Sequence, residues 1–122
     1  MEIYTSSFNF AKGLDSTKYF VVSISRFPPR WFRGFKCKEF APSASLLRKY
    51  RNGLSKEDYT SEFMSSVMES QDVHKVFEGL AILACRRDIV LCCFEGSDEF
   101  CHRQLVSSYV KARWGYSIKE LC

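Results

Sequence analysis

The residue types that could do chemistry are concentrated late in the chain, between positions 93 and 103 of the stretch RDIVLCCFEGSDEFCHR. A thiol close to a helix start and to an arginine gains thiolate character, which makes it a nucleophile or a redox group. A carboxylate and an imidazole beside it could exchange protons with a substrate. The candidate catalytic residues are therefore Cys93, Glu95, Cys101 and His102, with Arg103 next to them.

A strand and a helix are predicted to position these residues. Residues 89–94 are six consecutive apolar residues, a pattern typical of a central parallel strand that is covered on both faces. Gly96 and the candidate N-caps Ser97 and Asp98 predict a turn. From Cys101 onward, apolar residues recur on one face of a helix. In open α/β sheets, ligands bind in the crevice at such strand ends.

A second group of polar residues follows an earlier predicted strand, residues 18–25. Because parallel strands end at the same edge of a sheet, this group should face the same crevice as Cys93. The segment 26–38 that follows has five basic residues and no acidic one, interleaved with aromatic residues. The candidate ligand-binding residues are Ser23, Ser25, Arg26, Arg30 and Arg103.

The favoured interpretation is an anion site. Free N–H groups at a helix start, the helix dipole and a bidentate arginine together suit a phosphate or carboxylate, as in a nucleotide or a phosphorylated metabolite. The ordinary alternative is that Cys101 packs inward, Arg103 pairs with Glu95 or Glu99, and His102 is merely solvated.

Two other interpretations stay open. A zinc site could form from Cys93, Cys101 and His102 together with Cys37 or His74. The paired Cys-x-x-Cys spacing of common zinc sites is missing, however. We therefore expect no metal or cofactor. The basic and aromatic 26–38 loop could instead bind nucleic acid or a protein without catalysis. In that case Trp31 and Phe32 would stack on bases rather than pack into the core.

Length and composition indicate one globular domain, residues 1–122, with 46% hydrophobic and 16% aromatic residues and a net charge of +4. No apolar run reaches the roughly 20 residues of a membrane span, and the N-terminus lacks the pattern of a secretory signal. We therefore expect a cytoplasmic protein without membrane partners. In that compartment the cysteines should stay reduced, with Cys37, Cys85 and Cys92 as small buried apolar residues.

The remaining elements follow from periodicity and capping signals. Strands are predicted at residues 2–5, 18–25, 89–94 and 116–119, with an irregular connection at 30–42. Helices are predicted at 43–52, after Ser55, after Asp72, and from Cys101 to Gly115. This order predicts an α/β fold, a small mainly parallel sheet with helices on both faces in a single three-layer domain.

Several of these segments together resemble a known family. They are Tyr4-Thr5-Ser6, the Ser23-to-Pro29 segment SISRFPP, Ala41-Pro42, and Cys93-Phe94-Glu95 followed by Cys101-His102-Arg103. Together they resemble the domain-of-unknown-function 488 family over residues 2–120, in its short branch from bacteria and their prophages. The resemblance implies a compact α/β domain whose motifs meet at one cleft, and it supplies no activity.

Overall fold

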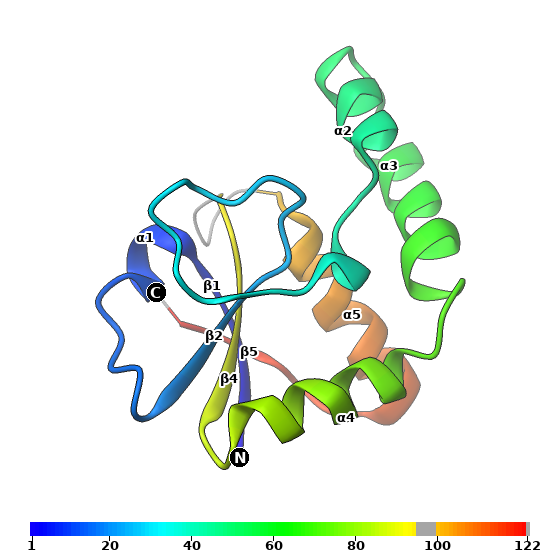
Figure 1. The fold of residues 1–122 in the computed structure, drawn as a ribbon. Helices are drawn as coiled ribbons and strands as arrows, with labels where there is room; N and C mark the ends of the chain where they lie inside the picture. The colour runs from blue at the N-terminus through cyan, green and yellow to red at the C-terminus, as the bar shows by residue number, and fades with distance from the viewer. Residues whose placement is uncertain (95–99, 122) are drawn as a thin grey trace.

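The computed structural model describes residues 1–94 and 100–121. These residues form a five-stranded sheet in the order β3-β2-β4-β1-β5 (Figure 1). Every strand pair is parallel, which agrees with the mainly parallel sheet that the sequence predicted. The strands are β1 (Ile3–Ser7), β2 (Tyr19–Ser23), β3 (Phe35–Lys36), β4 (Asp88–Cys93) and β5 (Lys119–Leu121). The apolar run of β4 lies at the centre of the sheet, and its residues from Ile89 to Cys93 are buried.

The helices are α1 (Phe8–Ala11), α2 (Ala44–Arg51), α3 (Lys56–Phe63), α4 (Val73–Ala84) and α5 (His102–Trp114). A 3-10 turn, Lys38–Phe40, precedes α2, and a π-helical turn, Met64–Met68, continues α3. Figure 1 shows α4 and α5 on one side of the sheet and α1 on the other, with α2 and α3 extending from its upper end. Within the described ranges, every helix is too short or too polar to cross a membrane.

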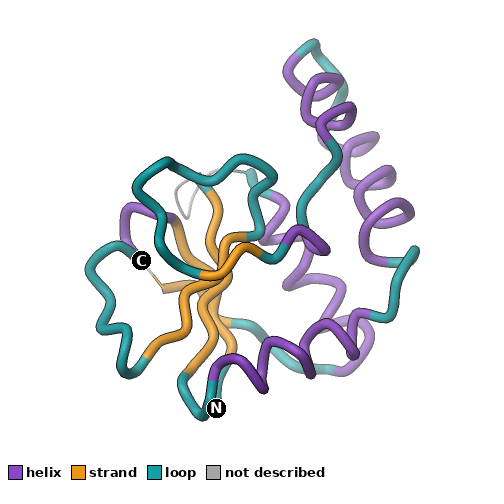
Figure 2. Tube along the Cα trace, viewed as in Figure 1, coloured by secondary structure: helices purple, strands orange, loops and turns teal. Residues whose placement is uncertain are grey.

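The two faces of the sheet are covered unequally. On one face, side chains such as Val22, Ile24 and Leu91 pack with α3, α4 and α5 in the larger core cluster. On the other face, Val90 and Cys92 pack against Phe8, Ala11 and Phe32, which come from α1 and a loop. Figure 2 shows how much of this second layer is loop rather than helix. The predicted three-layer α/β architecture is therefore present, with one layer much thinner than the other.

Local capping signals account for the helix starts. The side chains of Ser43, Ser55 and Asp72 each accept a hydrogen bond from the backbone N–H three residues later, which satisfies a free donor of the first turn. At the other ends, Gly53 follows α2 with φ +108° and Gly115 caps α5 with φ +70°. Glycine adopts these left-handed conformations without the steric penalty of a Cβ.

Four details differ from the sequence predictions, and the first is the last strand, which was predicted at residues 116–119 and is found at Lys119–Leu121. Cys85 is exposed rather than buried, because it ends α4 in a left-handed conformation and turns away from the core. The short strand β3 lies in the connection predicted to be irregular. Cys101 is the N-cap of α5 and not part of its first turn. The candidate caps Ser97 and Asp98 lie outside the described residues.

Candidate functional site

A cleft of about 240 Å³ lies at the carboxyl ends of β2 and β4, beneath α2 and α3. It brings together Ser25 and Arg26, which follow β2, with Cys101 and His102 at the start of α5. These pairs are far apart in sequence, so the fold creates their proximity. Its remaining lining residues are Phe27, Pro42, Leu47, Tyr50, Arg51, Tyr59, Phe94 and Phe100.

A hydrogen bond of His102 links the start of α5 to the end of β2, the two segments that line opposite parts of the cleft. Its Nε2 lies 2.6 Å from the carbonyl oxygen of Ile24, one residue before Ser25. A carbonyl can only accept, so Nε2 carries the proton and Nδ1 keeps a free lone pair, 3.7 Å from the sulfur of Cys101. Burial lowers the pKa of His102 to about 4, and the nearby Arg103 charge adds to this effect. His102 is therefore neutral at pH 7.

Arg103 lies behind the cleft and not in its lining. Its side chain is completely buried, and its guanidinium forms a two-point ion pair with Glu120 of β5, at 2.8 Å (Nη2–Oε2) and 3.2 Å (Nε–Oε1). Glu120 also accepts a 2.6 Å hydrogen bond from the hydroxyl of Thr5 on β1. Glu120 is an ion-pair partner that the sequence analysis did not name, and the two partners that it named, Glu95 and Glu99, lie outside the described residues. Arg103 thus ties α5 to two strands.

Another contact of Arg103 reaches the cysteines. Its Nη1 lies 2.9 Å from the sulfur of Cys93, and this sulfur is bonded to that of Cys101. The expectation that the cysteines stay reduced is therefore wrong for this pair. The disulfide arises because the end of β4 and the N-cap of α5 converge at the same corner. Cys93, Cys101, His102, Arg103 and Glu120 are called the buried corner below.

The same sulfurs and the His102 ring form the single group of potential metal ligands among the described residues, with ligand atoms within 4.8 Å of one another. Neither additional ligand that the sequence offered joins it. Cys37 is buried and its sulfur contacts Glu39, and His74 pairs with Glu78 on the surface of α4. While the two sulfurs are bonded to each other, they are not thiolates and a zinc ion has no thiolate ligand here.

The other predicted site residues are distributed differently. Ser23 is fully buried and its hydroxyl accepts a hydrogen bond from the backbone of Ser25, so it shapes the turn after β2. Arg30 is exposed and lies outside the cleft lining. Glu95 lies outside the described residues.

A family profile described as the active DUF488-N3 subclade matches residues 15–114. The chain belongs to the DUF488 family. Searches of curated proteins and of solved structures gave no match. The match confirms the resemblance of this DUF488 protein to the family over residues 15–114.

Sequence reasoning missed one wall of the cleft in this DUF488 chain. Arg51 ends α2, and Tyr50 beside it packs against Tyr59 and Phe100, with ring centroids 4.9 and 5.9 Å apart. The helix was predicted, but its docking over the strand ends depends on tertiary packing. The signal in the sequence was an arginine next to an aromatic residue near the end of a predicted helix, and this pattern is too common to identify a site.

Proposed function

We propose that the cleft binds a small ligand that has a planar ring and an anionic group, such as a mononucleotide or another phosphorylated metabolite. The observation that carries the proposal is the convergence of Arg26 and Arg51 on one cleft walled by aromatic rings. Both arginines are exposed, and neither has an ion-pair partner among the described residues. Guanidinium groups of this kind are suited to bidentate contacts with phosphate or carboxylate oxygens.

The aromatic wall supplies the second half of the recognition. Tyr50, Tyr59 and Phe100 pack on one another at centroid distances of 4.9 to 5.9 Å, so their ring positions are fixed before a ligand arrives. Stacking of a base on such a ring contributes about 1–3 kcal/mol. In our proposal a planar ring lies against this wall while the anionic group contacts Arg26 and Arg51.

The cysteines provide a route from binding to chemistry. Cys101 lines the cleft and Cys93 lies behind it. An external dithiol could reduce their bond by thiol–disulfide exchange, becoming a disulfide itself, and the freed Cys93 sulfur would lie 2.9 Å from the Arg103 guanidinium, a neighbour that favours the thiolate. His102 would then offer its free Nδ1 to the Cys101 thiol. Glu95 remains the proposed carboxylate of this site.

The test is calorimetric titration of the purified protein with inorganic phosphate, ribose 5-phosphate and the four ribonucleoside monophosphates. We expect at least one nucleotide to bind, and Arg26→Ala and Arg51→Ala each to weaken it at least tenfold, because a hydrogen bond to a charged group contributes about 1.5–3 kcal/mol. Arg48→Ala, on the same helix but outside the cleft lining, is the matched control and should change affinity less than about twofold. Absence of binding by every probe, or unchanged binding by Arg51→Ala, would contradict the proposal.

A second candidate function rests on the segment from the end of β2 to the 3-10 turn Lys38–Phe40. Phe27 is 65% exposed and Trp31 41% exposed, and both lie among the exposed cations Arg30, Arg33 and Lys38. Exposed rings between cations suit single-stranded nucleic acid. This function predicts strongly salt-dependent binding of a fluorescent oligonucleotide, lost in the Arg30→Ala/Arg33→Ala double variant and retained in Cys101→Ala. Binding that is insensitive to salt would exclude it.

A further inference from the structure

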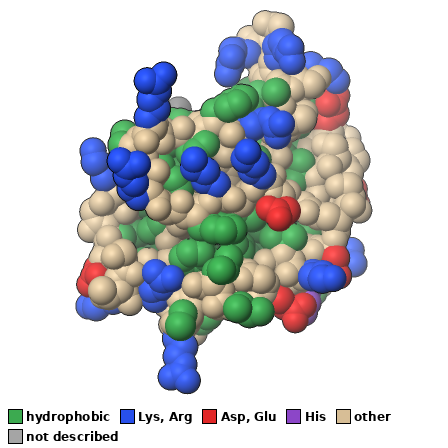
Figure 3. All heavy atoms as spheres, in the orientation of Figure 1, with side chains coloured by type: hydrophobic (Ala, Val, Ile, Leu, Met, Phe, Trp, Pro, Cys, Tyr) green, Lys and Arg blue, Asp and Glu red, His purple; other side chains and the backbone are tan. Residues whose placement is uncertain are grey.

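The thinly covered face of the sheet contains a larger hollow than the cleft. It has a volume of about 500 Å³ and lies between α1, the first half of β2 and the loop that ends in β3. It shares no lining residue with the cleft. The space-filling view shows a hydrophobic area in the middle of the molecular surface on this side, with lysine and arginine side chains above it (Figure 3). We call this hollow the side pocket.

The backbone builds the shape of the side pocket. β3 pairs with β2 only at Val22 and Ser23, so no strand lies beside the outer edge of β2 from Tyr19 to Val21 in the described structure. Gly34 brings the loop against this edge. A Cβ at Gly34 would lie 2.4 Å from the carbonyl oxygen of Val21 and 2.5 Å from the ring of Phe32. The close approach therefore requires glycine and fixes one wall of the pocket.

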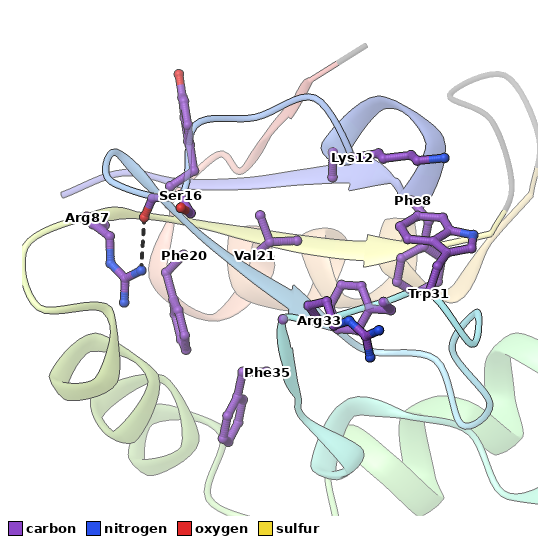
Figure 4. Close-up of a pocket in the computed structure, with 13 residues that line it drawn as sticks. Phe8, Lys12, Ser16, Phe20, Val21, Trp31, Arg33, Phe35 and Arg87 are labelled. Carbon is purple, nitrogen blue, oxygen red and sulfur yellow. Dashed lines mark hydrogen bonds between the residues drawn. The ribbon is translucent and has the colours of Figure 1, made fainter.

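The interior of the side pocket is largely apolar and aromatic. Phe8 packs edge-to-face against Trp31, with ring centroids 6.4 Å apart, and Phe20 lies 5.9 Å from Phe35. Figure 4 shows Val21 between these two groups of rings. A pocket of this size with aromatic walls and few polar groups is typical of sites for small organic molecules.

The charged residues of the side pocket all have the same sign. Lys12, Arg33 and Arg87 line it, and no acidic residue does so. Arg87 is held by the carbonyl oxygens of Ala84, Ser16 and Leu83 at 2.8 to 3.2 Å, and it therefore has a structural role.

The other two cations lie at the opposite end of the pocket, beside Trp31 (Figure 4). Lys12 Nζ lies 4.9 Å above the Trp31 ring, and Arg33 is exposed without an ion-pair partner among the described residues. An apolar chamber with two cations at one end, neither of which has an ion-pair partner among the described residues, is complementary to a molecule that has an apolar body and one anionic group.

We propose that the side pocket is a second binding site, for an amphipathic organic carboxylate such as a medium-chain fatty acid. The hydrocarbon chain lies over Val21 between the aromatic walls, and the carboxylate contacts Lys12 and Arg33. Burial of the chain supplies most of the free energy, at about 0.8 kcal/mol per CH₂ group. The two cations select a carboxylate over a neutral lipid.

The test is a fluorescence titration with decanoate below its micelle concentration. The Trp114→Phe variant leaves Trp31 as the reporter, because the chain has two tryptophans. We expect a saturable change in Trp31 emission, at least fivefold weaker binding in Lys12→Ala and in Arg33→Ala, and at least tenfold weaker binding of decanol. Lys36→Ala removes an exposed cation of β3 that does not line the pocket, and it should leave the decanoate affinity within about twofold, since exposed charges outside a site contribute little.

Several results would overturn the proposal. They are absence of saturable binding, equal affinity for decanol and decanoate, or equal losses in Lys36→Ala and Arg33→Ala. A concentration-dependent dimer that Trp31→Ala abolishes, without decanoate binding, would assign this face to a second copy of the chain. The Arg51→Ala variant separates the two proposals, because it should impair nucleotide binding in the cleft and leave decanoate binding unchanged.

Discussion

The buried corner and the cleft wall lie next to each other and use the same residue types in opposite ways. Arg103 is fully buried and paired with Glu120, whereas Arg51 is exposed and has no ion-pair partner among the described residues. In the buried corner, the guanidinium of Arg103 is hydrogen-bonded to groups of the protein. On the cleft wall, the guanidinium of Arg51 is available to a ligand.

This difference separates the residues that build the site from those that we propose contact a ligand. The residue types of the Cys-His-Arg sequence suit catalysis. Of the three, Arg103 is occupied by Glu120 and the Nε2–H of His102 by the Ile24 carbonyl. Their geometry holds the end of β2 against α5, and the cleft is the space that remains above them. The predictions below test this division by comparing stability with binding.

The largest expected effect is the loss of the buried ion pair. Glu120→Ala should lower the free energy of unfolding by about 3–5 kcal/mol, because it removes the two-point ion pair of the fully buried Arg103 side chain. Urea unfolding followed by circular dichroism measures this. The matched control is Glu62→Ala, which breaks the exposed ion pair with Lys49 and should cost less than about 1 kcal/mol. Similar losses in the two variants would contradict the structural role of Arg103.

His102 should make stability depend on pH. Burial lowers its pKa in the folded protein to about 4, from an ordinary value of 6.5, so the unfolded chain takes up the proton first as the pH falls. The contribution of neutral, buried His102 to the free energy of unfolding is complete above pH 6.5. It is lost as the pH falls from 6.5 to 4, by up to about 3 kcal/mol. Urea unfolding at several pH values measures this slope. His102→Gln should flatten it and His74→Gln, on the surface of α4, should not. A slope that His102→Gln leaves unchanged would assign the effect to other groups.

The disulfide should contribute a smaller amount. Cys93 and Cys101 are eight residues apart, and closing a loop of that length stabilises a fold by about 2–3 kcal/mol. A phosphine reductant should therefore lower the free energy of unfolding of the parent protein and of the Cys85→Ser control. The Cys93→Ala/Cys101→Ala variant should not respond to the reductant. Alkylation of both cysteines in denatured, unreduced protein would show that the bond is absent.

The smallest effects on stability are expected at the cleft wall. Arg26→Ala and Arg51→Ala should each change the free energy of unfolding by less than about 0.5 kcal/mol, the usual range for exposed sites. The same variants should show the largest losses in the nucleotide titration. A large stability loss in either variant would show that the wall, like the corner, is structural.

Local signals in the sequence predicted much of the fold. Ser43, Ser55 and Asp72 cap their helices through bonds that span three residues, and the apolar run of β4 identifies the central strand without knowledge of its neighbours. Arg26 and His102 were also assigned to one crevice, because parallel strands end at a common edge.

The parts that could not be predicted depend on contacts between distant segments. Nothing local indicates that Glu120, from a three-residue strand, enters the sheet beside β1 and meets Arg103. The disulfide depends on how closely the end of β4 approaches Cys101. The aromatic wall depends on where α2 and α3 dock. The side pocket is the consequence of a single-turn helix covering a sheet face, which no sequence pattern specifies.

The position of β5 has a consequence for the order in which the molecule is assembled. β5 hydrogen-bonds to β1, and Glu120 contacts Thr5 across 115 positions of the chain. During synthesis, α5 emerges from the ribosome before the residues that neutralise its buried arginine. A nascent chain ending before residue 120 therefore lacks the Arg103–Glu120 ion pair, and this link between α5 and the edge strand of the sheet forms only after β5 has been made.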